Sequence, residues 1–311
     1  MSLRSLAARL SATSSSAQLG ILVMLLGNLL FGINDVMGKW MVATYSVGQV
    51  LLIRSVVALA VLVPFLWKAG LRPLVSLERP GLQILRVIIA TVEVCAFYFA
   101  VVTLPLADVI TYWLAAPIYV AALSPLVLGE KVGWRRWTAI CIGFAGVIVA
   151  LEPSKAALTP PALISILGSF CFALMILISR ALRSTPDTTF AFWQLIGCVV
   201  FGLATIPFGW VTPSTADFSL LALLGVISML GHMCINRSLK LADAATVTPY
   251  QYTLLFWGVV FGWMVFGDVP RPSMLLGAAI IVASGLFIFL REQQLKRRAQ
   301  QHAASQDMRN A

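Results

Sequence analysis

The chain contains few charged residues. Only 11% of its 311 residues are Asp, Glu, Lys or Arg, and 60% are hydrophobic. An ordinary soluble domain has about 25% charged and roughly 45–50% apolar residues. A soluble protein of this length could not bury so much apolar surface. The shortage of charge therefore excludes a soluble globular protein and indicates an integral membrane protein.

The sequence is also poor in metal-binding and redox side chains. Its only histidines are His232 and His302, which excludes a histidine-based metal or catalytic cluster. Five cysteines lie in apolar segments, with no CxxC pair, no metal-ligand spacing and no disulfide framework. We expect these cysteines to be buried thiols. The sequence contains no nucleotide-binding motif, and no cofactor or metal is expected.

The charge that is present is distributed unevenly along the chain. Of the 22 Lys and Arg residues, 17 lie in the two tails and in every second connection between apolar segments. Only Lys39, Lys155 and Arg271 lie in the other connections, and Arg54 and Arg86 lie inside apolar segments. Positive charge is retained on the cytoplasmic side when a membrane protein inserts. The bias therefore predicts cytoplasmic termini and an even number of membrane spans.

The net charge of +10 could indicate nucleic-acid binding. The basic residues are, however, spread over short connections and do not gather on one face. We interpret them as topology signals and as contacts to anionic lipids. The expected partners are therefore the lipid bilayer and a small-molecule solute, with no nucleic acid. A homodimer is left open.

Ten apolar segments follow one another, and no soluble domain lies between them. The first follows Arg4 and Arg9, but its run of about 20 residues is long enough to span a bilayer, and no signal-peptide cleavage site follows it. Because lipid offers the backbone no hydrogen-bond partners, each segment is predicted to be a helix. The predicted spans are 19–38, 47–66, 82–102, 109–128, 137–151, 162–179, 190–208, 220–239, 247–266 and 274–290.

Two short segments recur in the same order in the two halves of the chain. Residues 104–108 (LPLAD) recur as 239–243 (LKLAD), and 128–130 (LGE) recur as 266–268 (FGD). Since five spans per half is an odd number, the halves must have opposite orientations in the membrane. The sequence thus predicts an all-α integral membrane fold of ten transmembrane helices in two inverted five-helix repeats, 19–151 and 162–290. Cytoplasmic tails, 1–18 and 291–311, flank the repeats.

Several polar side chains lie inside the predicted spans, where they are costly unless they face a cavity or a partner. Counting from the span ends at 1.5 Å per residue places Asn28, Arg54 and Glu93 in one layer. An Arg54–Glu93 ion pair could simply hold two helices together, or it could open when a solute competes for it. Arg86 is expected to extend to the cytoplasmic surface. Asp35 and Lys39 are expected to form an exposed pair one helical turn apart.

A second polar group lies toward the cytoplasmic side of the second half, and two aromatic residues lie near the outside in the first half. Inverted repeats would produce this mirrored placement. The aromatic residues could line a cavity or form the interfacial aromatic belt, and His232 could be a helix-packing residue or a ligand. The candidate residues are Trp193, Gln194, His232, Asn236, Tyr250 and Gln251 in the second half, with Tyr112 and Trp113 in the first.

Taken together, these features resemble the drug/metabolite transporter superfamily, of the EamA-domain type, over residues 19–290. The resemblance depends on two sets of five spans, on Gly48-Gln49 leading into a span that contains Arg54, on the repeated Leu-Ala-Asp segments, on Pro117 and on Gly129-Glu130. It implies a secondary carrier of the bacterial inner membrane, with a central cavity lined by both halves and neither an ATP site nor a prosthetic group. Related bacterial proteins carry amino acids, S-adenosylmethionine, nucleosides and riboflavin, and the chain also resembles the proteobacterial riboflavin importers.

Three classes of function remain as alternatives. A secondary transporter is favoured, with riboflavin uptake ahead of S-adenosylmethionine uptake or export of an amino acid or other metabolite. An intramembrane enzyme would need a catalytic pair at one depth, and Glu93 has no His or Asp companion in its layer. A membrane scaffold or sensor would have no need for a buried polar layer. A flat aromatic solute would stack on Trp113, Trp193 or Tyr250, whereas an amino acid would use Arg54 for its carboxylate and Glu93 for its ammonium.

The charge bias predicts that the C-terminus is cytoplasmic. A reporter enzyme that is active only in the periplasm should therefore give no activity when it is fused after Ala311. The same reporter inserted after Lys155 should be active and serves as the control. Strong activity of the fusion at Ala311 would contradict the predicted topology.

Overall fold

The computed structural model describes residues 3–128, 133–151, 159–182, 184–241 and 247–310, which contain α-helices and short 3₁₀ segments and no strand. The elements are α1 (Leu3–Val42), α2 (Val47–Ala69), α3 (Arg72–Val75), α4 (Pro80–Val101), α5 (Leu106–Trp113), α6 (Ala116–Leu128), α7 (Trp134–Leu151), α8 (Pro160–Ala181), α9 (Asp187–Thr205), η1 (Ile206–Phe208), α10 (Thr215–Leu241), η2 (Thr248–Tyr252), α12 (Thr253–Phe266) and α13 (Pro272–Asn310). The helical fold class expected from the sequence is confirmed in these residues.

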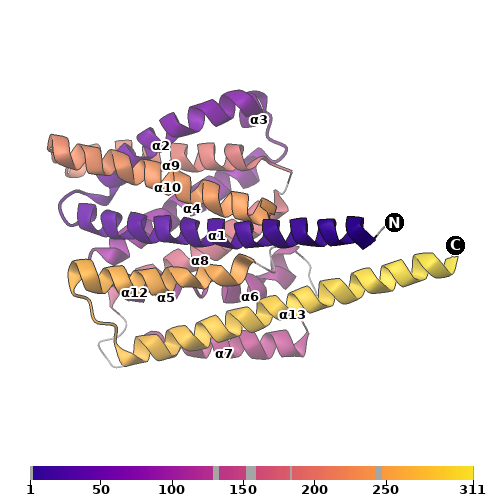
Figure 1. Cartoon of the computed structure of the whole chain (residues 1–311). Coiled ribbons are helices and arrows are strands. Elements are labelled where there is room, and N and C mark those ends of the chain that lie inside the picture. The colour runs from indigo at the N-terminus through magenta and orange to yellow at the C-terminus, as the bar shows by residue number, and fades with distance from the viewer. Residues whose placement is uncertain (1–2, 129–132, 152–158, 183, 242–246, 311) are drawn as a thin grey trace.

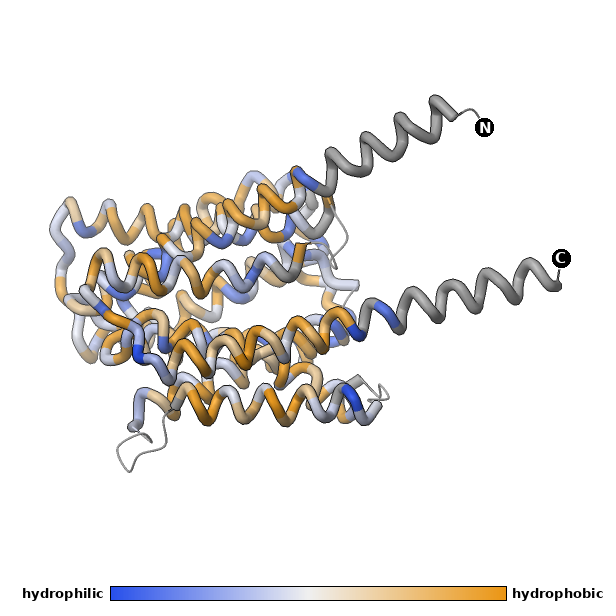
Figure 2. Tube along the Cα trace, turned by 60° about the horizontal axis from the view of Figure 1, so that its bottom comes forward, coloured by the Kyte–Doolittle hydropathy of each residue, from blue (hydrophilic) through white to orange (hydrophobic). Residues whose placement is uncertain are grey.

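Eight helices in the described ranges are long and apolar enough to cross a membrane. Two shorter apolar helices, Trp137–Ala150 and Tyr250–Phe266, occupy the positions of the fifth and ninth predicted spans. Figure 2 shows apolar residues along the whole length of the bundle. Glu130 and Asp243, which belong to the repeated sequence segments, lie outside the described residues.

Two of the apolar segments are discontinuous helices. The fourth is broken between α5 and α6, and Pro117 is the second residue of the new helix. The ninth starts as the 3₁₀ segment η2, with Pro249 in its first turn, and continues as α12. Proline is tolerated in a first turn because the amide hydrogen that it lacks would have no intrahelical partner there. Broken helices at corresponding positions of two halves are typical of the solute sites of transporters.

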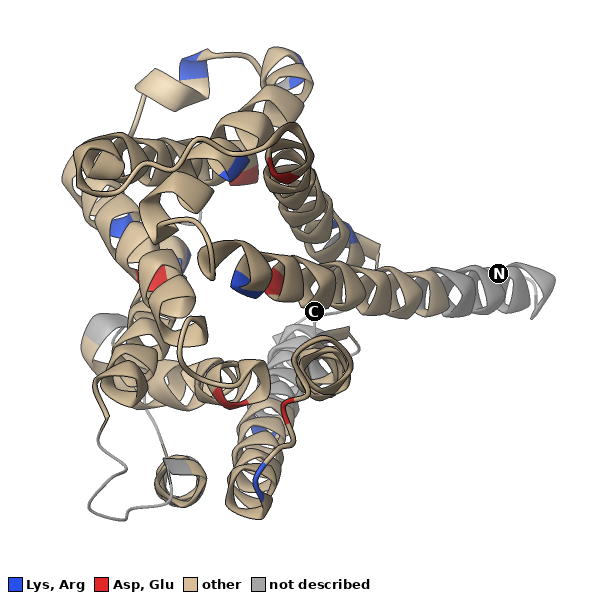
Figure 3. Cartoon of the chain, turned by 90° about the vertical axis from the view of Figure 1, so that its left-hand side faces the viewer, with Lys and Arg blue, Asp and Glu red and all other residues tan. Residues whose placement is uncertain are grey.

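The helices form a closed ring in which the two halves alternate. Following the packing contacts around the ring, α1 packs on α10, α10 on α2, α2 on α9, α9 on α4, α4 on α8, α8 on α5 and α6, α5 on α12, and α12 on α1. In this order around the ring, each helix is followed by one from the other half of the chain. Figure 3 views the helices from one end of the ring. The halves are therefore interleaved and do not form two separate bodies.

Helices α7 and α13 lie outside the ring and pack along one another (Figure 1). Gly146 and Gly277 face each other at this contact, where a Cβ atom on Gly277 would lie 2.6 Å from the carbonyl oxygen of Gly146. Glycine permits this close approach of two helices in a membrane.

Both ends of the chain lie at the same end of the bundle (Figure 1). We call this the termini end; the far end is the opposite one, where α1 ends at Val42 and α5 begins at Leu106. An even number of spans requires this arrangement. The C-terminal tail continues α13 as a helix through Asn310.

The cysteines correct one expectation. Cys95, Cys171 and Cys198 are buried, but Cys234 is only half-buried and Cys141 is exposed. Cys141 belongs to α7, which lies outside the ring, so one face of its helix is not covered by other helices. The sequence could not distinguish burial in protein from contact with lipid, because both environments are apolar.

Candidate functional site

Arg54 lies between the two halves at the centre of the ring. Its guanidinium donates one hydrogen bond to the Tyr98 hydroxyl on α4 and another, of 3.2 Å, to the Ser228 Oγ on α10. The guanidinium carbon also lies 5.4 Å from the centre of the Tyr98 ring. Arg54 thus joins α2 and α4 of the first half to α10 of the second half. Tyr98 is 1% exposed, so Arg54 is held by a rigid neighbour.

Glu93 does not pair directly with Arg54, in contrast to the ion pair considered from the sequence. Its Oε1 accepts a hydrogen bond of 2.6 Å from the Trp113 Nε1. Trp113 is the last residue of α5, directly before the break in the fourth span. The ring of Phe97 meets the Trp113 ring edge-on, with centroids 5.2 Å apart. Glu93, 8% exposed, therefore fixes the end of a discontinuous helix.

Asn28 makes the corresponding contact at the break in the other half. Its Nδ2 donates to the Tyr250 carbonyl oxygen at 2.7 Å and to the Thr253 Oγ1 at 3.0 Å. These acceptors lie where η2 passes into α12. A carbonyl at such a junction needs a partner because no water is available in lipid. The sequence placed Asn28 and Glu93 in one layer, and the structure shows that each one supports a helix break.

The sequence-based expectation of an exposed Asp35–Lys39 pair is wrong. Asp35 is buried, accepts a hydrogen bond of 3.0 Å from the Asn34 Nδ2 and interacts electrostatically with Arg54. Lys39 binds Asp268 instead. The expectation assumed that the end of α1 faces water, but α1 is packed in the ring between α10 and α12.

Arg86 also departs from expectation, because it does not extend to the surface. It is buried, its Nε donates to the Ser179 Oγ at 2.7 Å, and its guanidinium lies 4.1 Å from the centre of the Phe190 ring. These contacts join α4 to α8 and α9. Its position between two helices of the other half makes Arg86 a structural residue.

His232 and Asn236 extend the polar centre along α10 toward the termini end. His232 Nδ1 lies 2.8 Å from the Ser228 carbonyl oxygen, and its ring meets Phe31 edge-on. Both side chains are exposed. At about 100° per residue, His232 is about 160° around the helix from the exposed Leu230. His232 is therefore exposed on the side of α10 that faces away from Leu230, toward Ser228 and Arg54.

The other predicted site residues separate into two groups. Gln194 is half-buried one turn from Cys198, which lies near Arg54, and Tyr250 and Gln251 are exposed on η2. Trp193 points about 140° away from Cys198 around α9, and its Nε1 donates to the Leu74 carbonyl oxygen on α3 at 3.1 Å. Tyr112 is buried in an apolar cluster. The structure therefore does not bring Trp193 and Tyr112 to the centre.

Three residues of the centre were not foreseen from the sequence. Tyr98 and Ser228 lie in apolar segments without any distinguishing pattern. Asp35 did carry a signal, since an acidic residue inside an apolar helix usually faces a cavity or a partner. Its spacing of four residues from Lys39 suggested a local partner instead.

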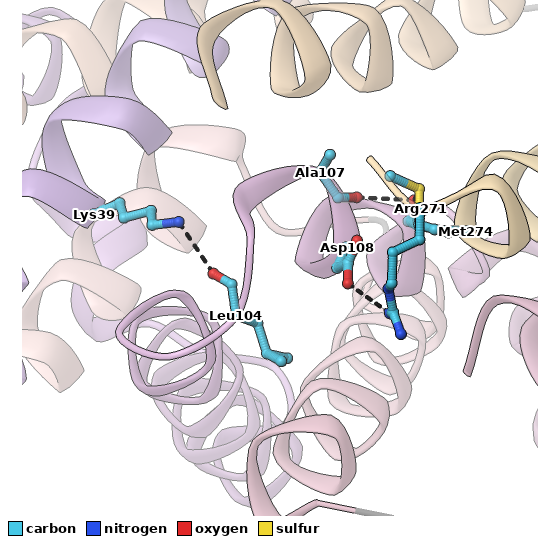
Figure 4. A network of polar contacts seen from close by, with 7 residues as sticks. Lys39, Leu104, Ala107, Asp108, Arg271 and Met274 are labelled. Atoms are coloured by element: carbon cyan, nitrogen blue, oxygen red, sulfur yellow. Dashed lines mark hydrogen bonds and ion pairs between the residues drawn. The ribbon is translucent and has the colours of Figure 1, made fainter. Parts of the chain in front are cut away.

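At the far end the two halves are joined by charged groups. Lys39 Nζ lies 2.8 Å from an Asp268 carboxylate oxygen and donates to the Leu104 carbonyl oxygen at 3.2 Å. An Arg271 guanidinium nitrogen lies 2.8 Å from an Asp108 carboxylate oxygen. Figure 4 shows the contacts of Lys39 with Leu104 and of Arg271 with Asp108. Both ion pairs connect a residue of the first half to one of the second.

The centre presents hydrogen-bonding groups together with aromatic rings. Among the described residues, no three His, Cys, Asp or Glu side chains come together. A shallow groove of about 380 Å³, lined by Ile53, Trp210 and Phe218 among others, does not include the central polar residues.

Residues 18–151 and 159–290 each match the family described as the EamA-like transporter family. The riboflavin transporter of Vibrio cholerae is 30% identical over 285 residues, covering 90% of this chain and 95% of that protein. The riboflavin transporter of Rhizobium johnstonii is 27% identical over 293 residues, covering 93% and 97%. The S-adenosylmethionine uptake transporter of Rickettsia prowazekii is 26% identical over 278 residues, covering 88% and 94%. A solved crystal structure with 16% identity overlays with a TM-score of 0.59, covers 91% of this chain and 99% of that one, and shows likeness of fold alone.

The Glu93–Trp113 hydrogen bond should contribute to stability through its acceptor and not through its charge. Glu93→Gln retains an acceptor for the indole N–H, whereas Glu93→Leu leaves that buried donor unpaired, at a cost of about 1–3 kcal/mol. Thermal unfolding in detergent should therefore occur at a lower temperature for Glu93→Leu than for Glu93→Gln. In a Trp113→Phe background this difference should disappear. Equal unfolding temperatures for the two variants in the parent background would contradict the assignment.

Proposed function

Because this chain belongs to the EamA-like transporter family, we propose that it is a secondary transporter that carries a small organic metabolite across the bacterial inner membrane by alternating access. Riboflavin uptake is the leading assignment. The observation that supports the mechanism is the placement of Arg54, which contacts α4 of its own half and α10 of the other at the centre of an interleaved ring. A movement of one half against the other would change this contact directly.

The proposal includes ten spans with both termini in the cytoplasm. Helix α7 has 18 residues, which at 1.5 Å per residue gives about 27 Å and nearly crosses a hydrocarbon core of about 30 Å. It packs along α13, and α12 packs along α1. Both partners are long enough to span. The same end of the bundle holds both termini, in agreement with an even number of spans.

The polar centre is compatible with a flat aromatic solute. Trp113 and Phe97 provide aromatic faces beside Glu93, and the exposed His232 lies one turn along α10 from Ser228, which binds Arg54. A planar ring system is recognised by aromatic faces together with a few polar groups at its edges. Two riboflavin transporters, at 27% and 30% identity, match nearly the whole chain.

S-adenosylmethionine uptake is the second candidate, favoured by one specific feature. Two carboxyl groups, Asp35 and Glu93, lie close enough to Arg54 to interact with it electrostatically. A centre with two carboxyl groups and one guanidinium would suit a solute that carries a cation, as a sulfonium does. Export of an amino acid or other metabolite is the alternative direction. A non-transporting scaffold would have no use for the exposed polar face of α10.

Riboflavin uptake predicts growth rescue. Cells that cannot synthesise riboflavin should grow at a lower riboflavin concentration when they express this protein than with an empty vector. A parallel strain that cannot synthesise S-adenosylmethionine should show no rescue. Rescue of the second strain alone would transfer the assignment to S-adenosylmethionine. Failure of both, together with altered amino acid efflux, would favour an exporter.

A matched pair of arginine variants tests whether the centre carries the activity. Arg54→Gln should abolish rescue while the protein still inserts, because it removes the cation shared by the halves. Arg237→Gln should retain rescue, since Arg237 is exposed near the end of α10, away from the centre. Membrane levels of both variants are measured in parallel by immunoblot.

A further inference from the structure

We propose that the ion pairs Lys39–Asp268 and Asp108–Arg271 form a gate that closes the far end of the solute path, and that α5 couples this gate to Glu93 at the centre. The inference rests on the proposed transport function and names the residues through which one half is held against the other.

The four charged residues form one cluster that spans the halves. Lys39 lies near the end of α1, Asp108 lies in the first turn of α5, and Asp268 and Arg271 lie in the connection from α12 to α13. Besides its ion pair with Arg271, Asp108 interacts electrostatically with Asp268 and Lys39. Any separation of the halves at this end must break two charge pairs together.

Each ion pair of the gate has one buried and one more exposed partner. The Asp108 and Lys39 side chains are 6% and 13% exposed, whereas those of Arg271 and Asp268 are 47% and 25% exposed. At another part of the far end, the Gln49 side chain binds the Val211 backbone in both directions, its Nε2 donating at 2.6 Å and its Oε1 accepting at 3.1 Å. Gln49 belongs to the first half and Val211 to the second, so this contact also holds the far end closed.

The termini end differs from the far end. There, Trp193 contacts Leu74 between the halves, and Ser184 contacts Glu78. Nevertheless, the polar residues that lead from Arg54 toward this end are exposed, among them His232, Asn236, Tyr250 and Gln251. The structure thus combines a closed far end with a polar face accessible toward the termini end.

Helix α5 joins the gate to the centre. It contains eight residues, with Asp108 in its first turn and Trp113 as its last residue. The five-residue separation corresponds to about 7.5 Å along the axis. A helix of two turns, separated from α6 by a break, moves as one unit. Its two ends are held by the Asp108–Arg271 pair and by the Trp113–Glu93 hydrogen bond.

The coupling has a defined direction. While Glu93 holds Trp113, α5 keeps Asp108 against Arg271 and the gate is closed. A solute group that binds the Glu93 carboxylate in place of the indole releases Trp113, α5 reorients, and the far-end pair weakens. Removing either contact of α5 should therefore open the far end. Because both contacts act through the same helix, removing both should have little more effect than removing one.

Cys198 provides a reporter for this movement, since it is buried near Arg54. In a protein that retains only this cysteine, a membrane-impermeant maleimide is added to spheroplasts and, separately, to inverted vesicles. Asp108→Asn, Asp268→Asn and Trp113→Phe should each raise the labelling rate from the far-end side about fivefold or more. Ser214→Ala, which removes a hydrogen bond to Asp217 within the second half at the same end, should leave the rate unchanged.

A charge exchange distinguishes a gate from general loosening. Lys39→Asp and Asp268→Lys should each accelerate labelling, and the double variant should return toward the parent rate. Unchanged labelling in the single variants overturns the gate, and additive effects of Trp113→Phe and Asp108→Asn overturn the coupling through α5. The readout requires no solute. If the gate variants change the Cys198 labelling rate as expected but the protein takes up no solute, only the transport assignment is rejected. If the protein takes up solute but the gate variants leave the labelling rate unchanged, the gate is rejected.

Discussion

A polar group inside a membrane has no water to bind, so it must find its partner within the protein. This constraint explains the most informative contacts of the structure. Asn28 donates a hydrogen bond at the junction of η2 and α12, and Glu93 accepts one from the indole of Trp113, the last residue of α5. Arg54 distributes its donors over Tyr98 and Ser228. Each contact joins elements that belong to different helices, so satisfying a polar group also fixes how the helices are arranged.

The interleaving of the two halves has a mechanical consequence. Each helix of the ring has both of its ring neighbours in the other half of the chain. A displacement of one half therefore changes contacts all around the ring and is not limited to one surface. The charged pairs at the far end and Arg54 at the centre are then affected by the same movement. The central Arg54 and the charged pairs of the far end contact both halves, and the Glu93–Trp113 hydrogen bond joins two helices of the first half.

The breaks in the fourth and ninth segments both lie at a proline. Pro117 and Pro249 mark both positions, but a proline in an apolar segment can also kink a continuous helix. The structure ends one helix at Trp113 and begins the next at Ala116, leaving α5 as a separate short unit. Its two ends contact charged residues of different parts of the molecule, which gives a short segment a role that its composition does not indicate.

The sequence by itself determined the membrane environment, the helical class and the order of the apolar segments, because these depend on composition and on the position of charge along the chain. It also identified Asn28, Arg54 and Glu93 from their depth. Only the tertiary structure decided their partners, since depth says nothing about direction around a helix. Lys39 binds Asp268 and not Asp35, and Glu93 binds Trp113 and not Arg54. Such pairs form between different segments of the chain, and the packing of the ring selects them.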